Sequence, residues 1–194
     1  MKWTIDKRFD FCYGHRVHNQ TLNAEFSVDA CLACRHLHGH QGEIKILLQG
    51  DELSNGMVTD FKHMNWFKVF LDDVLDHKFI MDINDPLLAH EVPDLIKFEH
   101  FSGTTNVPKK VLDFGLCLEH LQGYWTPNIN LIGNLDQAVY EKYEGMVFVD
   151  FVPTSENLSA WLLRIARNKM VALDVKVVAV EFWETPKSHC RVDV

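Results

Sequence analysis

The sequence is poor in residues that interrupt regular structure. It contains ten glycines and six prolines among 194 residues, which is low for a globular chain and excludes a collagen-like or a proline- and glycine-rich disordered protein. A chain of this length buries enough apolar surface to fold without disulfide or metal staples. We therefore expect a single domain over residues 1–194.

Clustered positive charge and long apolar runs are also missing. The formal net charge is −8, and no run of Lys or Arg exceeds two residues, which argues against a nucleic-acid surface. No stretch approaches the roughly 18 apolar residues of a membrane helix. The first residues lack the apolar core of a secretory signal, and the five cysteines are irregularly spaced. We expect a cytoplasmic protein with reduced thiols, a small-molecule substrate, and neither a nucleic-acid nor a membrane partner.

Hydrophobic periodicity predicts an α+β domain in which an antiparallel sheet is covered on one face by two helices. One helix is capped by Asp60 and ends near Asp76, and the other begins at Thr154 or Ser155 and ends near Lys169. The predicted strands cover residues 3–15, 38–50, 175–185 and 189–194.

The segment between the two predicted helices is different in composition. Residues 82–150 hold four of the six prolines and only short apolar runs. We interpret this segment as an insertion with one strand near residues 145–151.

Histidines are concentrated in one part of the chain. Five of the eleven lie between residues 15 and 40: His15, His18, His36, His38 and His40. His38 and His40 project to the same face of a strand, and His15 lies on the apolar face of the strand before it. Three neutral imidazoles on one buried face predict a catalytic zinc site with an open position, whereas hydrogen-bonded core histidines are the structural alternative. His18 and His36 lie outside this pattern.

Three other features have both a chemical and a structural interpretation. Cys34 precedes His38 by four residues and is either a thiolate base beside a metal or a small buried side chain. Asp76-His77 is either an acid–base relay or a solvated helix end. Glu184 lies on an apolar strand face and either binds a guanidine-like N–H pair of a ligand or forms a salt bridge.

Taken together, six short motifs resemble one enzyme family. The motifs are Phe11-Cys-Tyr-Gly-His15, Cys34-Arg-His-Leu-His38-Gly-His40, Gly56-Met-Val-Thr-Asp60-Phe61, Leu75-Asp76-His77, Pro153-Thr-Ser-Glu156-Asn157-Leu and Glu184-Thr-Pro186. In this order they resemble 6-pyruvoyl-tetrahydropterin synthase and its relative 6-carboxytetrahydropterin synthase of the queuosine pathway.

The resemblance implies the tunnelling fold (T-fold) and a role for each motif residue. In this family the fold assembles as a homo-oligomer, here expected to be a trimer-based assembly such as a hexamer, with active sites at subunit boundaries. The implied zinc ligands are His15, His38 and His40, and the implied catalytic residues are Cys34, Asp76 and His77. Glu184 is implied to anchor the pterin, and Thr154 and Glu156 to line its pocket.

The spacing of Cys34 before the two histidines resembles the carboxypterin branch. The implied reaction converts 7,8-dihydroneopterin triphosphate to 6-carboxytetrahydropterin, with release of acetaldehyde and triphosphate. The alternatives are the pyruvoyl branch, which eliminates triphosphate without carbon–carbon cleavage, and a zinc-stabilised binding module without activity. The chain departs from the family at Gln41-Gly42, where the family often has a polar residue and an aromatic, and we expect a more open pocket wall there.

Overall fold

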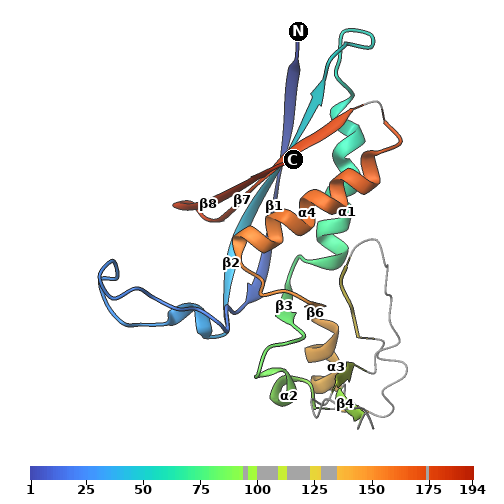
Figure 1. The fold of residues 1–194 in the computed structure, drawn as a ribbon. Coiled ribbons are helices and arrows are strands. Elements are labelled where there is room, and N and C mark those ends of the chain that lie inside the picture. The colour runs from blue at the N-terminus through green and yellow to red at the C-terminus, as the bar shows by residue number, and fades with distance from the viewer. Residues whose placement is uncertain (94–95, 100–108, 113–122, 128–134, 174) are drawn as a thin grey trace.

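A six-stranded sheet with the strand order β6-β3-β1-β2-β7-β8 organises the molecule (Figure 1). The computed structural model describes residues 1–93, 96–99, 109–112, 123–127, 135–173 and 175–194. The strands are β1 (Trp3–His15), β2 (His38–Gly50), β3 (Lys78–Asp82), β4 (Ile96–Glu99), β5 (Lys109–Leu112), β6 (Met146–Val149), β7 (Lys176–Thr185) and β8 (Ser188–Asp193). The helices are α1 (Asn65–Val74), α2 (Leu88–Glu91), α3 (Gln137–Glu144) and α4 (Ser155–Met170), with short 3-10 turns at Ala33–Arg35 and Phe61–Met64.

The centre of the sheet is a long antiparallel pair. β1 and β2 align from Trp3 opposite Gly50 to His15 opposite His38. Alternate residues of β1 are buried, as the period-2 pattern predicts. β7 and β8 continue the antiparallel arrangement from the other edge of β2, so the four predicted strands are confirmed with nearly the predicted limits.

Helices α1 and α4 lie on one face of the sheet (Figure 1), and we call this the inner face. Their apolar stripes pack into a core with the buried side chains of β1, β2 and β7. The predicted cap at Asp60 is present, since its side chain accepts a hydrogen bond from the backbone N–H of Lys62. A 3-10 turn then precedes α1. Thr154 caps α4 in the same way by accepting from the backbone N–H of Asn157.

Two parallel strands extend the sheet beyond the predicted antiparallel arrangement. β3 pairs with β1 in parallel, and β6 pairs with β3 in parallel. β6 is the strand expected near residues 145–151. β3, by contrast, was not anticipated, and it makes the sheet mixed rather than purely antiparallel.

The predicted insertion at 82–150 is only partly covered by the described residues. There it contains α2, the β4-β5 hairpin, α3 and β6, and the rest of the segment lies outside the described residues. Among the helices that the structure describes, none has the length and apolar character required to span a membrane.

Candidate metal centre and active site

Three histidines converge on the inner face where β1 and β2 meet. The antiparallel register places His15 directly opposite His38, and His40 opposite Tyr13. The ring centroids are 4.5 Å apart for His15 and His38, 5.1 Å for His15 and His40, and 4.9 Å for His38 and His40. Candidate ligand atoms of all three residues lie within 4.8 Å of one another.

Backbone carbonyls orient two of the rings. The Nδ1 atom of His15 lies 2.6 Å from the carbonyl oxygen of Pro153, and Nδ1 of His38 lies 2.8 Å from that of His36. A carbonyl can only accept, so each Nδ1 carries the proton and each Nε2 is left with its lone pair. Sequence reasoning missed both partners, because a backbone carbonyl has no residue-type signal.

The surroundings of His15 and His40 favour their neutral forms, which are the forms that bind a metal ion. Burial, together with the neighbouring imidazoles of His38 and His40, lowers the pKa of His15 to about 4, although the hydrogen bond to Pro153 acts in the opposite direction. Burial also lowers the pKa of His40, although the carboxylate of Glu184 acts in the opposite direction. The Nε2 atoms of His15 and His40 are buried and have no hydrogen-bond partner among the described residues. Neutral imidazoles with free, converging Nε2 atoms fit a zinc ion with an open coordination position.

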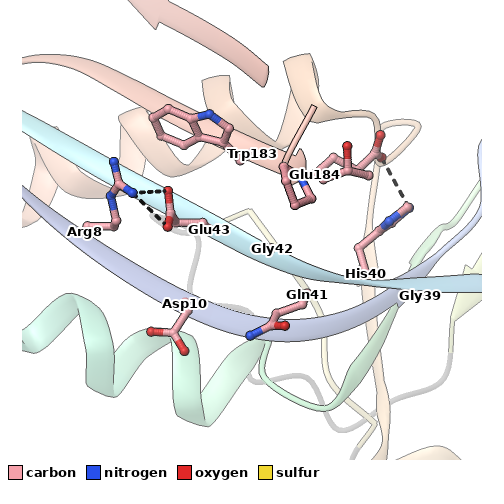
Figure 2. A pocket seen from close by; sticks show the side chains of 11 residues that line it. Arg8, Asp10, Gly39, His40, Gln41, Gly42, Glu43, Trp183 and Glu184 are labelled. Atoms are coloured by element: carbon pink, nitrogen blue, oxygen red, sulfur yellow. Dashed lines mark hydrogen bonds and ion pairs between the residues drawn. The ribbon is translucent and has the colours of Figure 1, made fainter. Parts of the chain in front are cut away.

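Glu184 lies beside this cluster at the end of β7. One of its carboxylate oxygens, Oε1, is 3.4 Å from Nε2 of His15 and 3.7 Å from Nε2 of His40. Figure 2 shows the side chains of Glu184 and His40 directed toward each other at the edge of a cavity of about 590 Å³. The cavity is also lined by Arg8, Trp183 and neighbouring residues, so Glu184 is placed between the histidine cluster and a space large enough for a ligand.

Asp76 and His77 lie on the opposite, outer face of the sheet. The Asp76 carboxylate accepts from the backbone N–H of Cys12 at 2.7 Å and lies 3.0 Å from Nδ1 of His77. The His77 side chain is 80% exposed. Asp76 and His77 form a cluster with Cys12, a residue that the sequence analysis did not single out because it alternates away from the apolar positions of β1.

Burial tends to raise the pKa of Asp76, but the hydrogen bonds from Cys12 and His77 outweigh it and hold this pKa below its usual value. Asp76 is therefore ionised at neutral pH and can accept a hydrogen bond from the adjacent imidazole.

Cys34 lies in the segment that joins β1 to β2 and extends away from the sheet (Figure 1). It is half-buried in a 3-10 turn, where its N–H donates to the side-chain oxygen of Gln20 and its carbonyl accepts from Val17. Cys31 is exposed. The cluster that contains Asp76 and His77 includes Cys12 but not Cys34. One chain therefore does not bring together the three residues expected to form the proton relay.

Thr154 and Glu156 lie at the start of α4. Thr154 is engaged as the helix cap, and Glu156 is exposed in the first helical turn. Neither residue lines the cavity beside Glu184. From the same motif, the carbonyl oxygen of Pro153 does contact the histidine cluster, because it accepts a hydrogen bond from Nδ1 of His15.

Fold and site together define a class of protein: an α+β sheet protein with a three-histidine candidate metal site at the edge of a ligand-sized cavity. The chain belongs to the 6-pyruvoyl tetrahydropterin synthase family, whose model matches residues 4–193. It is 30% identical to 6-carboxy-5,6,7,8-tetrahydropterin synthase of Aquifex aeolicus, over 98% of each chain.

Solved structures agree with this assignment at the level of the fold. An uncharacterized protein from Wolinella succinogenes is 44% identical and superposes with a TM-score of 0.84, covering 100% of this chain and 98% of its own. Plasmodium vivax 6-pyruvoyl tetrahydropterin synthase is 12% identical with a TM-score of 0.54, covering 100% and 99% of the two chains. The expected T-fold is confirmed.

Proposed function

We propose that the chain is a zinc-dependent 6-carboxy-5,6,7,8-tetrahydropterin synthase, a lyase that acts on 7,8-dihydroneopterin triphosphate. The observation that carries the proposal is the set of free, inward-facing Nε2 atoms of His15 and His40 next to Glu184 and a cavity. The 30% identity to the Aquifex aeolicus enzyme over the whole chain supports this branch of the family. Water and the substrate would give 6-carboxytetrahydropterin, acetaldehyde and triphosphate.

The three imidazoles would hold the zinc ion through their Nε2 atoms. Bound there, zinc supplies Lewis acidity toward the hydroxyl and keto oxygens of the substrate side chain. Glu184 accepts N–H bonds from the amino-pyrimidine edge of the pterin and fixes the orientation of the ring. Cys34 takes and returns the protons of the side chain.

The proton relay of Cys34 requires a second copy of the chain. Asp76 and His77 are held on the outer face of the sheet, and the His77 side chain is largely exposed. In a trimer-based homo-oligomer with sites at subunit boundaries, this pair is available to the Cys34 of a neighbouring copy. We propose such an assembly, located in the cytoplasm, where the thiols of Cys34 and Cys31 stay reduced.

Product analysis tests the proposed activity. The zinc-loaded protein is incubated with 7,8-dihydroneopterin triphosphate, and the products are identified by mass, with acetaldehyde trapped as its hydrazone. We expect the carboxylated tetrahydropterin and acetaldehyde in equal amounts. A pyruvoyl product without acetaldehyde would assign the chain to the other branch, and unchanged substrate would indicate a zinc-stabilised binding module.

A further inference from the structure

Tyr13 occupies an unusual place beside the histidine cluster. It lies on the inner face of β1, is 3% exposed, and follows the period-2 pattern that also buries Phe11 and His15. Its ring centroid is 5.1 Å from that of His15 and 5.8 Å from that of His40. Tyr13 therefore packs against the same two imidazoles that Glu184 approaches from the end of β7.

The Tyr13 ring fits there because Gly42 has no side chain. A Cβ atom at Gly42 would lie 3.0 Å from Cε1 of Tyr13 and 3.3 Å from Cε2 of Phe182. Such contacts are tighter than packed side chains normally accept. On the inner face, the more open wall expected at Gly42 is thus filled by Tyr13, which brings a hydroxyl group into the site.

The hydroxyl of Tyr13 stands out among the polar groups that the structure describes. Its oxygen is buried and makes no hydrogen bond among the described residues, as is also true of Nε2 of His15 and His40. A phenol hydroxyl is protonated at neutral pH and can donate a hydrogen bond. A buried donor without an acceptor is costly, so its presence requires an explanation.

Metal binding would change which groups at this site are available as hydrogen-bond partners for Glu184. In the ligand-free arrangement the Glu184 carboxylate lies against His15 and His40. Neither Nε2 atom makes a hydrogen bond to this carboxylate, and a metal ion bound to both atoms would prevent one from forming. Glu184 is then an acceptor in need of a donor, and Tyr13 is a buried donor in need of an acceptor, both packed on the same imidazoles.

We propose that Tyr13 is a positioning residue for Glu184: once a metal ion occupies the histidine cluster, the Tyr13 hydroxyl donates a hydrogen bond to the Glu184 carboxylate and fixes its orientation. The inference rests on the metal site of the proposed function. A bond that forms only in the metal-bound protein contributes to metal affinity by linkage, so it can be measured without any turnover.

The test compares Tyr13→Phe, which keeps the ring and removes only the hydroxyl, with the unmodified chain. We expect zinc affinity, measured by competition with a chelator, to fall about tenfold. The Tm of the metal-free variant should be unchanged or higher, because an unsatisfied buried group is lost. The KM for 7,8-dihydroneopterin triphosphate should rise with little change in kcat.

Two further variants make the result specific. Tyr143→Phe removes the hydroxyl of another buried tyrosine, outside the histidine cluster, and should leave zinc affinity unchanged. In a Glu184→Gln background, Tyr13→Phe should change zinc affinity by less than about twofold, because the charged acceptor is already gone.

Each alternative outcome has a distinct meaning. Equal zinc affinity of Tyr13→Phe and the unmodified chain would overturn the inference and leave the metal site intact. A full tenfold effect of Tyr13→Phe in the Glu184→Gln background, or a marked loss of metal-free Tm, would overturn it by showing a different partner for the hydroxyl. Failure of the unmodified chain to bind zinc would overturn the proposed function, and the inference with it.

Discussion

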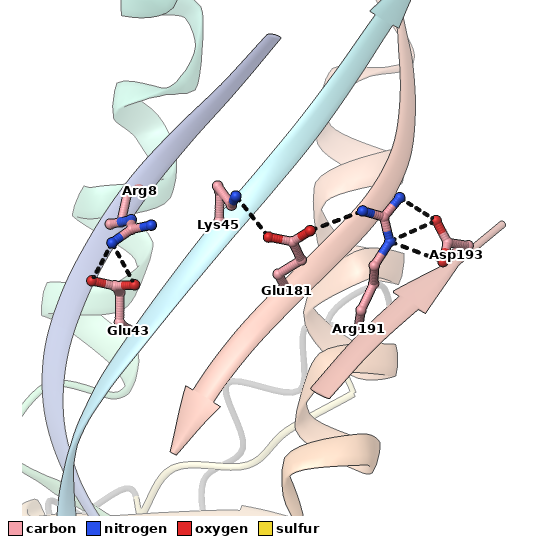
Figure 3. A network of polar contacts seen from close by, with 6 residues as sticks. All are labelled: Arg8, Glu43, Lys45, Glu181, Arg191 and Asp193. Atoms are coloured by element: carbon pink, nitrogen blue, oxygen red, sulfur yellow. Dashed lines mark hydrogen bonds and ion pairs between the residues drawn. The ribbon is translucent and has the colours of Figure 1, made fainter. Parts of the chain in front are cut away.

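The two faces of the four antiparallel strands differ in whether their polar groups have partners. On the outer face, charged side chains form ion pairs across β1, β2, β7 and β8 (Figure 3). Arg8 lies 3.1 Å from Glu43, Lys45 lies 2.7 Å from Glu181, and Arg191 lies 2.9 Å from Glu181. On the inner face, three buried polar atoms have no hydrogen-bond partner among the described residues: Nε2 of His15, Nε2 of His40 and the hydroxyl of Tyr13.

This difference separates structural polar groups from functional ones. A charge with a partner is accounted for by the fold alone, whereas an unpaired buried nitrogen or hydroxyl makes the fold less stable until something binds to it. The alternation of a strand places both kinds only one residue apart. Substitutions in the histidine cluster and in the outer ion pairs should therefore have opposite signatures: loss of ligand and activity in the cluster, and loss of stability in the ion pairs.

The largest effect is expected at the metal ligands. His38→Ala should lose stoichiometric zinc and all measurable turnover, since even loss of an outer partner of a metal-bound histidine costs about 10- to 100-fold. The Tm of the metal-free protein should stay close to that of the unmodified chain, because the core does not need the metal. Metal analysis and thermal unfolding measure both quantities, with Arg191→Ala on the outer face as the control. Stoichiometric zinc in a protein lacking both His38 and His40 would show that the ligand assignment is wrong.

The second-largest effect is a loss of kcat expected at Cys34 and His77, which would act together across two copies of the chain. Cys34→Ala and His77→Gln should each reduce kcat by about 10²- to 10⁴-fold and retain zinc, because both act in proton transfer. Co-expression of the two variants should restore part of the activity, since some sites then combine an intact Cys34 with an intact His77 from another copy. Cys31→Ala is the matched thiol control and should be active. A co-expressed mixture as inactive as its parents would contradict the shared site.

A smaller effect is expected at Glu184, where the inner face meets the cavity. Glu184→Gln keeps the shape and replaces one acceptor with a donor, so the KM for the pterin substrate should rise about 10- to 100-fold. The Tm should change little. A lowered Tm with unchanged kcat/KM would instead identify Glu184 as a structural ion-pair partner.

The smallest effect is expected on the outer face and concerns stability at low pH. Burial tends to raise the pKa of Glu181, but the hydrogen bonds and charges of Lys45 and Arg191 outweigh it and hold this pKa below its ordinary value. Such a carboxylate stabilises the fold above its unfolded-state pKa of about 4.3, and this contribution is lost as the pH falls through the folded-state pKa.

Glu181→Gln should therefore lower the Tm at pH 7 by about 2–4 °C, corresponding to about 1 kcal/mol, and the difference should disappear toward pH 3. Turnover at pH 7 should be normal. Thermal unfolding between pH 3 and pH 7 measures this, with the exposed Glu52→Gln as the control. A pH-independent difference would show that the ion pairs do not titrate as described.

The central strands and the two covering helices could be predicted because their patterns are long. β1 and β2 have 13 residues each, and α4 has 16, so period and caps are unambiguous. β3 has only five residues and begins four residues after α1 ends. Its parallel pairing with β1 and β6 joins segments far apart in the sequence, which local periodicity cannot reveal.

The histidine cluster could be predicted for the same reason, since strand alternation places His15, His38 and His40 on one face. The partners that orient it could not, because the carbonyls of Pro153 and His36 have no side-chain signature. The position of Asp76 and His77 on the outer face follows from the turn between α1 and β3, and no spacing rule predicts it. Their expected relay with Cys34 stays a prediction.

The backbone of His77 has a consequence for how this protein can evolve. Its φ of 59° lies in the left-handed region, where a residue with a Cβ atom costs roughly 1–2 kcal/mol and glycine costs almost nothing. A laboratory selection for heat resistance alone should therefore favour glycine at this position. The gain in thermal stability and the loss of the imidazole would come from one codon change, so position 77 is a point where selection for stability and selection for catalysis oppose each other.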